Sequence, residues 1–231
     1  MKFQLLLLFL LMPFALWAQD STMITIKSGS RISDVLTTTD IFLYPQYKQG
    51  IVLFKDGTKA GARMNYNSYL DQMLFLNEKG DTMAVRDEKL IKHIALGVDT
   101  FYYHNGYIRL LTQNGGAILA VKSVWEVADI RKRGSHNRQA MTYAVTTIRT
   151  ITDDMGRTRE LVLDEDMVLR KKESYLFGDR NYHFEPAGKK SLLVLFPKLE
   201  NVIIPYLNDH KINFHKRDDN QKLIQLIGQS I

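Results

Sequence analysis

Four cations fall within a short stretch that otherwise shows no strong helix or hairpin pattern. They are Arg131, Lys132, Arg133 and Arg138. Irregular backbone stays at the surface, because burying it leaves polar groups unpaired. The nearest acids are Asp129 before the cluster and Asp153 after it, so local acids cannot pair all four cations. The cluster predicts an exposed patch that attracts an anionic partner. The alternative is a solvated loop without a partner.

The histidines offer one local cluster that resembles a metal site. His183 and Glu185 share a face if they lie on a strand, and Asp179 is close in sequence. No third ligand is spaced to match, and no H-E-x-x-H motif occurs. An exposed polar strand end is therefore the favoured interpretation. The sequence predicts neither a bound metal nor a cofactor.

Two acidic clusters raise the question of acid–base chemistry. Paired carboxylates can hydrolyse a substrate when a cleft holds them together. The clusters are Asp153-Asp154 and Asp164-Glu165-Asp166. Both have turn-like surroundings, where aspartate is common for backbone reasons, so solvated turns are favoured. No G-x-S-x-G, phosphate-loop or dinucleotide motif occurs, but a catalytic triad is a matter of geometry and stays open.

Composition excludes several further chemistries. The chain has no cysteine, which rules out disulfides, thiolate metal sites and a cysteine nucleophile. Its 231 residues are 45% hydrophobic and 24% charged, as in an ordinary globular protein. The net charge of +6 favours anionic surfaces. For an exported chain these are envelope lipids, glycans or acidic proteins, and no nucleic acid is expected.

Residues 1–18 have the pattern of a secretory signal peptide. Lys2 supplies the positive charge, an apolar run follows, and Ala18 is a small residue at the cleavage point. A membrane anchor is the alternative, but the run is shorter than the ~20 residues of a spanning helix and contains Pro13. We therefore expect an exported protein, periplasmic or extracellular, without a transmembrane anchor after cleavage.

Two dipeptides predict tight β-hairpins in the middle of the chain. Asp56-Gly57 and Asn105-Gly106 suit two-residue turns, which need positive φ at both central positions. The first turn would pair Leu53 with Ala60, and the second would pair Phe101 with Leu110. In this register, apolar side chains share one face of each hairpin.

The aromatic residues around the second turn admit two interpretations. Phe101 and Tyr103 would face one way and Tyr102 the other, with Tyr107 across the turn. An aromatic platform for a glycan or peptide is conceivable. Ordinary core with a rim of tyrosines is favoured.

The pattern along the chain predicts an α+β protein. After a flexible lead-in over residues 19–40, residues 41–185 read as an antiparallel β-meander, curled into a half-barrel or small barrel. Within it, residues 129–158 read as a long basic loop. The apolar period changes from 2 to 3.6 over residues 186–231, which predicts a small helical unit, with a kink or early break at Pro205.

Several short motifs resemble a family of exported proteins of Bacteroidota-type bacteria. One is the run Gln49-Gly50-Ile51-Val52-Leu53-Phe54-Lys55-Asp56-Gly57, followed by Asn65-Tyr66-Asn67. In the tail they are Lys189-Lys190, Leu195-Phe196-Pro197-Lys198, Tyr206 and Ile212-Asn213-Phe214. The resemblance covers most of the chain after the signal peptide and implies export. It assigns no activity, so no functional residue comes with it.

These observations lead to two hypotheses of different classes. The first is a non-catalytic envelope module that binds or scaffolds another envelope component. The second is a periplasmic hydrolase whose carboxylates are brought together by the fold. A deep pocket with convergent titratable groups would favour the enzyme, and a shallow charged or apolar surface would favour the module.

Overall fold

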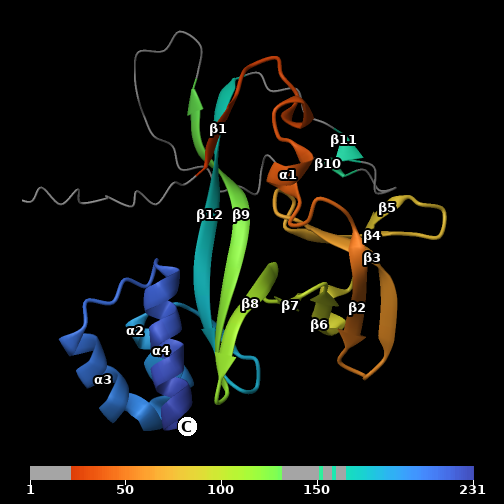
Figure 1. Ribbon diagram of the computed structural model, residues 1–231. Helices are drawn as coiled ribbons and strands as arrows, with labels where there is room; N and C mark the ends of the chain where they lie inside the picture. The colour runs from red at the N-terminus through yellow and green to blue at the C-terminus, as the bar shows by residue number, and fades with distance from the viewer. Residues whose placement is uncertain (1–21, 132–150, 153–157, 160–164) are drawn as a thin grey trace, which may run out of the picture.

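The computed structural model describes residues 22–131, 151–152, 158–159 and 165–231 (Figure 1). The predicted signal peptide, residues 1–18, lies outside the described residues. Lys132, Arg133 and Arg138 also lie outside them, whereas the backbone of Arg131 is described. The acids Asp153, Asp154 and Asp164 fall outside them as well.

The fold is α+β, with an open antiparallel sheet of 11 strands followed by C-terminal helices. The strands before the long central pair are β1 (Met23–Ile26), β2 (Lys48–Phe54), β3 (Lys59–Asn67), β4 (Gln72–Leu76), β5 (Thr82–Ala84), β6 (Ile91–Leu96), β7 (Asp99–Tyr103) and β8 (Tyr107–Asn114). The remaining sheet strands are β9 (Ala117–Arg131), β12 (Asp166–Gly178) and β13 (Phe184–Pro186). Strands β10 (Ile151–Thr152) and β11 (Thr158–Arg159) form a separate pair.

The strand order shows two meanders joined side by side. Strands β2 to β5 follow one another, as do β6 to β9, and β6 pairs with β2 instead of β5. Strand β5 is short and mostly exposed, so it offers no apolar face for β6 to extend. The 3₁₀ turn η2 (Glu88–Leu90) returns the chain to β2, where Ile91 and Ile94 bury against Val52.

Both predicted hairpins form, but each register is shifted by one residue. The first pairs Leu53 with Lys59, and the second pairs Phe101 with Arg109. In each hairpin three residues, not two, lie between the last residues that pair, since the Phe54 N–H reaches the Thr58 carbonyl and Tyr103 pairs with Tyr107. A three-residue loop moves every later side chain on one strand to the other face. The predicted register is therefore wrong in both.

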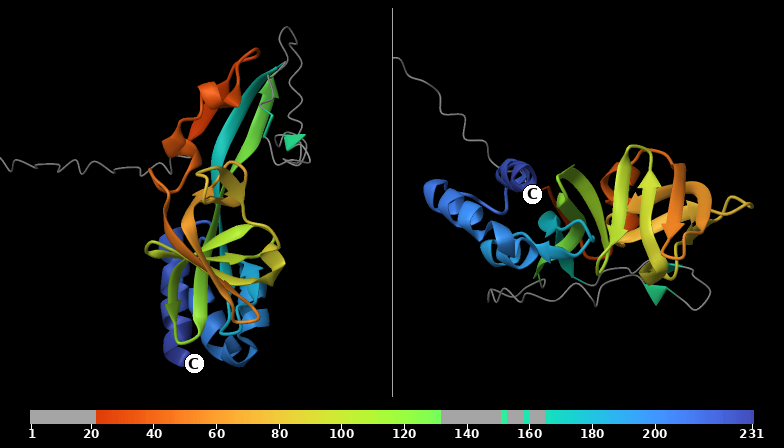
Figure 2. Two further views of the ribbon diagram at one scale, coloured as in Figure 1. Left: turned by 90° about the vertical axis from the view of Figure 1, so that its right-hand side faces the viewer. Right: turned by 90° about the horizontal axis from the view of Figure 1, so that it is seen from below.

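Strands β9 and β12 form a long two-stranded ribbon that carries the other parts of the molecule (Figure 1). The curled part, β2 to β8, lies along one side of the ribbon (Figure 2). The helical unit lies at the end where Gly178 pairs with Ile118. The N-terminal segment lies towards the other end, where Arg131 pairs with Asp166. Residues 174–177 belong to the continuous β12.

The predicted flexible lead-in needs correction for the part that the structure describes. After β1 come the 3₁₀ turn η1 (Ile32–Asp34) and the short helix α1 (Thr38–Ile41). Ile26, Ile32 and Leu36 are buried in one cluster with Trp125 of β9. The apolar residues lie far apart in a polar sequence, so their pattern gave no periodic signal.

The predicted helical unit consists of α2 (Lys189–Leu195), η4 (Pro197–Leu199), α3 (Glu200–Asp209) and α4 (Arg217–Ser230). Helix α3 continues through Pro205, so the predicted early break does not occur. The helices pack Leu192, Ile203 and Leu223 against the ribbon. Helix α4 also lies against β8 and β9, which fixes the helical unit to the sheet.

Candidate binding site

One face of the ribbon changes character twice along its length, from apolar to polar and back to apolar. Side chains alternate on a strand, so Trp125, Ser123 and Val121 share this face with their neighbours on β12. Trp125 packs under the N-terminal segment, and Val121 begins the cluster under the helical unit. Between these apolar sections the face is polar, because it carries Ser123, Lys171 and Glu173. The polar section faces the curled part.

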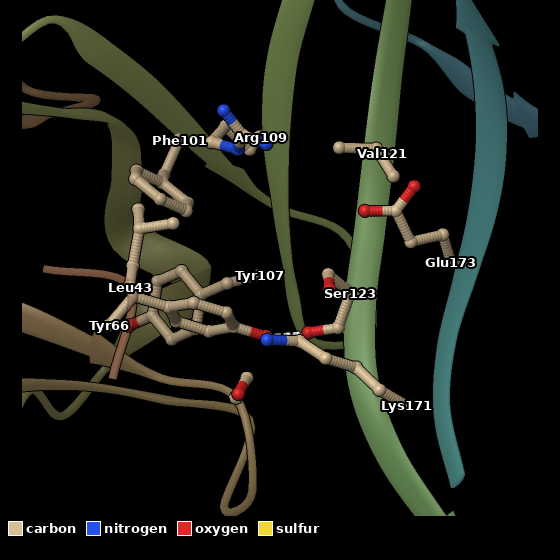
Figure 3. Close-up of a pocket in the computed structure, with 10 residues that line it drawn as sticks. Leu43, Tyr66, Phe101, Tyr107, Arg109, Val121, Ser123, Lys171 and Glu173 are labelled. Carbon is tan, nitrogen blue, oxygen red and sulfur yellow. Dashed lines mark hydrogen bonds between the residues drawn. The ribbon is translucent and has the colours of Figure 1, made fainter. Parts of the chain in front are cut away.

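A hollow of about 130 Å³ lies at this polar section (Figure 3). Its apolar wall consists of Leu43, Tyr66, Phe101, Tyr107 and Val121. Its polar lining consists of Ser68, Arg109, Ser123, Lys171 and Glu173. We call this site the central hollow. Its residues come from six separate stretches of sequence, which only the folded sheet brings together.

Arg109 is held in the central hollow by a network of paired groups. Its Nη1 lies 3.0 Å from Oδ1 of Asp99, and the Tyr44 hydroxyl donates to the other oxygen of Asp99. Burial, reinforced by the hydrogen bond to Asp99, raises the pKa of Tyr44. The hydroxyl therefore stays protonated and donates at neutral pH. Arg109 therefore lines the site with its charge already paired by Asp99.

A second network fixes the floor of the curled part beside the central hollow. Oδ1 of Asp71 accepts hydrogen bonds from the Tyr66 hydroxyl at 2.9 Å and from the Tyr107 N–H at 3.1 Å. Its other oxygen lies 2.9 Å from the Lys122 ammonium. The Tyr66 hydroxyl also lies 3.2 Å from the Ser123 carbonyl oxygen on the ribbon. Asp71 thereby ties three strands around the site.

The other edge of the central hollow carries two charges of opposite sign. Lys171 and Glu173 lie two residues apart on β12 and so project from the same face (Figure 3). Oε2 of Glu173 accepts a hydrogen bond of 3.0 Å from the Tyr175 hydroxyl. Burial, followed by the nearby charge of Glu173, raises the pKa of Tyr175 to about 12. Tyr175 therefore remains a donor to Glu173 over the physiological range.

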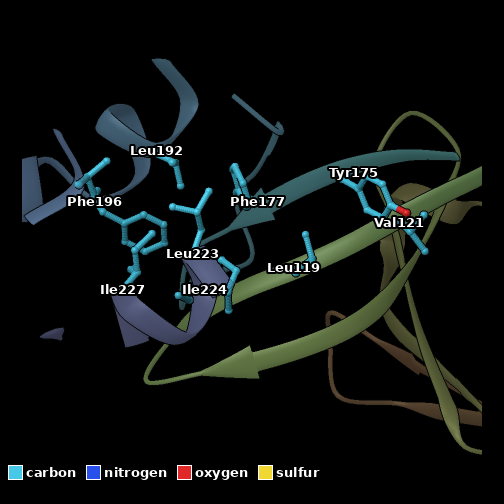
Figure 4. Close-up of a cluster of buried hydrophobic side chains, with 11 residues drawn as sticks. Leu119, Val121, Tyr175, Phe177, Leu192, Phe196, Leu223, Ile224 and Ile227 are labelled. Atoms are coloured by element: carbon cyan, nitrogen blue, oxygen red, sulfur yellow. The ribbon is translucent and has the colours of Figure 1, made fainter. Parts of the chain in front are cut away.

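Below the central hollow the same ribbon face is sealed by the helical unit (Figure 4). Leu119 and Phe177 follow Val121 and Tyr175 along the two strands and are fully buried. Leu223 and Ile224 of α4 pack against them. The site is therefore bounded by a closed apolar core on this side.

The predicted basic cluster is placed only through its first residue. Arg131 ends β9 and pairs in register with Asp166, at the end of the ribbon opposite the helical unit. Lys132, Arg133 and Arg138 follow it in the sequence but lie outside the described residues, so their role as a patch stays a prediction.

The predicted histidine cluster is a surface turn. His183 lies 3.4 Å from Asp179 and is largely exposed, and Glu185 is exposed on β13. Burial raises the pKa of Asp179, but backbone hydrogen bonds from His183 and Asn181 outweigh it, so the net pKa is lowered. No set of three metal-ligating side chains occurs in the described part of the chain.

The acidic cluster at Asp166 also has a structural partner. Its side chain lies 2.8 Å from the Lys27 ammonium and accepts a hydrogen bond from the Ser28 N–H. Asp166 and Glu173 are seven residues apart on one strand, or about 23 Å. These carboxylates therefore do not converge on a single substrate.

The aromatic residues at the second turn divide between two faces as predicted. Phe101 and Tyr103 face the core of the curled part, while Tyr102 belongs to the cluster on the outer face. Tyr182 stacks on Tyr102 with ring centroids 5.0 Å apart. The Tyr102 ring is therefore covered, which agrees with the core interpretation.

Sequence reasoning missed every polar residue of the central hollow. Arg109 escaped because the predicted register placed it on the other face of its hairpin. Lys171 and Glu173 did carry a signal, since they interrupt the alternation between Leu169 and Tyr175 on one strand face. That signal has meaning only once the partner strand and its facing elements are known.

Comparison with known proteins yields no assignment, because no protein-family model, curated protein or solved structure matches this chain. Among the described helices none has the length and apolar character needed to cross a membrane.

Proposed function

We propose that the protein is an exported, non-catalytic module of the cell envelope that binds another envelope component. The observation that supports this most directly is the central hollow, where six separate parts of the chain converge on a mixed apolar and charged site. Binding sites combine an apolar wall with a few placed polar groups in this way. Export rests on the signal-like residues 1–18.

The alternative of a hydrolase is less well supported by the same geometry. A two-carboxylate mechanism needs acids within several ångströms of one another. Among the described residues, Glu173 is the one carboxylate that lines the central hollow, and Asp166 lies far along the same strand. Glu173 instead accepts a hydrogen bond from Tyr175.

Site-blocking substitutions test the proposal. Ser123→Phe places a bulky ring in the central hollow, whereas Ser174→Phe adds the same ring on the exposed opposite face of the ribbon. Tagged mature protein should retain an envelope component when it carries Ser174→Phe and lose it when it carries Ser123→Phe. Matching thermal midpoints for the two variants exclude unfolding as the cause. Equal retention by both variants would reject the central hollow as the binding site.

The basic cluster provides a separate contact in this proposal, with an anionic envelope component. Replacing Arg131, Lys132, Arg133 and Arg138 with glutamine should weaken envelope association at low salt. Association of the wild type should also fall as salt shortens the Debye length. If the variant and the wild type associate equally at low salt, the cluster is not a contact.

A further inference from the structure

Two charges at the edge of the central hollow, Lys171 and Glu173, form no ion pair within the described part of the chain. In the described part of the chain, no carboxylate lies within ion-pair distance of the Lys171 ammonium, which lies 6.0 Å from the centroid of the Trp125 ring. Its charge acts on Asp40 only at longer range, where it adds to the hydrogen bonds from Thr37 that lower the pKa of that carboxyl. Glu173 accepts the Tyr175 hydroxyl, and no cation of that part pairs with it. Lys171 is partly buried and Glu173 is exposed. A partly desolvated charge gains more from a counter-ion than a fully hydrated one does, so the stronger ligand contact is expected at Lys171.

Other charges on and near the ribbon behave differently. Arg109 is paired with Asp99, and Lys122 with Asp71. On the opposite face of the ribbon, Glu126 bridges Arg170 and Lys172. Charge pairing is thus common among the neighbours of the central hollow, and Lys171 and Glu173, which line it, depart from that pattern.

The spacing of the two charges sets the chemistry of a ligand. Residues two apart on a strand are separated by about 6.6 Å, and both side chains face the same side. A molecule that meets both therefore carries a carboxylate and an ammonium group close together. The aromatic wall of Tyr66 and Phe101, both buried, suits a small apolar body between these groups.

The volume of the central hollow limits the size of the ligand. At about 130 Å³ it is slightly smaller than the cavity of ~150 Å³ that accommodates a benzene ring. It therefore has room for a compact body of several non-hydrogen atoms. An oligosaccharide or a folded protein segment would extend well beyond it.

We propose that the central hollow binds a small zwitterion, an amino acid or the equivalent groups of a short peptide, with its carboxylate at Lys171 and its ammonium at Glu173. This inference rests on the proposed function and names the ligand class of the same site. Ser123 supplies a further hydroxyl to the lining, whereas the Ser68 hydroxyl already donates to the Ile41 carbonyl oxygen.

NMR titration of the purified mature protein tests the ligand class. The probes are L-valine, isovalerate, which lacks the ammonium group, and isobutylamine, which lacks the carboxylate. Valine should shift the amide signals of Ser123 and Lys171 in a saturable way, with a dissociation constant of order millimolar. Each single-charge analogue should bind at least about tenfold more weakly. The dipeptide Gly-Val and N-acetylvaline separate a free amino acid from a peptide end.

Charge-neutral variants assign each charge to its partner. Lys171→Gln should weaken binding of isovalerate and leave isobutylamine unchanged, whereas Glu173→Gln should do the reverse. Both substitutions should weaken the binding of valine at least about fivefold. Lys172→Gln is the matched control, because its side chain lies on the opposite face of the same strand and is half exposed.

The outcomes separate this inference from the proposed function. The ligand class is supported if valine binds in a saturable way to the wild type and more weakly to Lys171→Gln and Glu173→Gln. If isovalerate binds as tightly as valine, or if no probe binds, the zwitterion inference is overturned. Loss of envelope association in Ser123→Phe would still support the envelope role in that case, since that measurement uses the native component and no added probe.

Discussion

The helical unit and the curled part are attached to the same ribbon by different interactions. The core under the helices consists of apolar side chains such as Leu119, Phe177 and Leu223, which are fully buried. In the curled part, polar residues are buried as well. Of the four buried polar residues in the described part, Asn65, Asn67 and Ser68 gather at the end of β3.

This difference shows how a site is made on a scaffold. Asn65 bonds both polar groups of the Tyr44 backbone, and Asn67 accepts from the N–H groups of Tyr69 and Leu70. Such bonds fix chain direction more strictly than apolar contacts, because hydrogen bonds need defined angles. The apolar core holds the helical unit in place, while the polar bonds shape the wall of the central hollow.

The largest loss of stability is expected from a substitution in the apolar core under the helical unit. Leu223→Ala should reduce the free energy of unfolding by about 2–5 kcal/mol, because it removes a fully buried side chain and leaves a cavity. If the two regions are held separately, hydrogen exchange should show reduced protection in α2 to α4 and little change in β2 to β7. Uniform loss of protection across both would show that they unfold as one unit.

On the polar side, the key residue is Asp71. Asp71→Ala should lower the free energy of unfolding by about 2–4 kcal/mol, because it removes the partner of Lys122 and leaves the Tyr66 hydroxyl and the Tyr107 N–H with fewer acceptors. Chemical denaturation measures the change. Lys172→Gln breaks a more exposed ion pair and serves as the control. Similar losses in the two variants would argue against a special role for Asp71.

Disrupting the contact between α4 and the β8–β9 turn should reduce the free energy of unfolding by an intermediate amount. Gly115 has φ of +55°, and a Cβ there would overlap the carbonyl oxygen of Gly228 in α4. Gly115→Ala should therefore cost about 1–3 kcal/mol and loosen the helical unit. Gly57→Ala is a useful control, since it also has positive φ but open space around it. An equal cost at both sites would mean that strain alone, without the contact, explains the result.

At alkaline pH, ionisation of Tyr102 on the outer face of the curled part should lower the stability of the fold. Burial, followed by the nearby Tyr182, raises the pKa of Tyr102 to about 12. A raised pKa stabilises the fold below the unfolded value near pH 10, and this contribution is lost as pH rises towards 12. In Tyr102→Phe the free energy of unfolding should fall by about 1 kcal/mol less than in the wild type as the pH rises through this window. Urea midpoints measured across the window would detect the difference. An unchanged slope would assign the decline to other tyrosines.

The smallest effect is expected at the opposite end of the ribbon from the helices. Lys27 is mostly exposed, and its ion pair with Asp166 is screened by solvent. Lys27→Gln should change the free energy of unfolding by about 0–1 kcal/mol and less at high salt. A loss above this range, measured by denaturation, would show that this end contributes as much as the polar network around Asp71.

The sequence predicted the framework through local signals. Asp56-Gly57 and Asn105-Gly106 marked real hairpins, and the change of period after Pro186 marked the helices. These features depend on neighbours in sequence, so their residues report them directly. The three-residue loops could not be read with the same certainty, because Gly at a turn satisfies positive φ in more than one loop length.

The central hollow depended on information that no local pattern contains. Arg109 reaches it only because of the shifted register, and Glu173 only because β12 pairs with β9 across a long separation in sequence. The lead-in escaped prediction for a similar reason, since Ile26 and Leu36 bury against Trp125, about a hundred positions away. Contacts of this kind are set by tertiary packing and not by propensity.

Trp125 gives the molecule a built-in optical reporter. The chain has two tryptophans, and the other, Trp17, belongs to the predicted signal peptide. The indole of Trp125 is buried, donates to the Asp40 carbonyl oxygen at 3.0 Å, and lies beside Lys171. Tryptophan emission from the mature protein would thus come from a single ring at the border between the N-terminal cluster and the central hollow. Its intensity and colour would follow any movement of the Lys171 charge without an attached label.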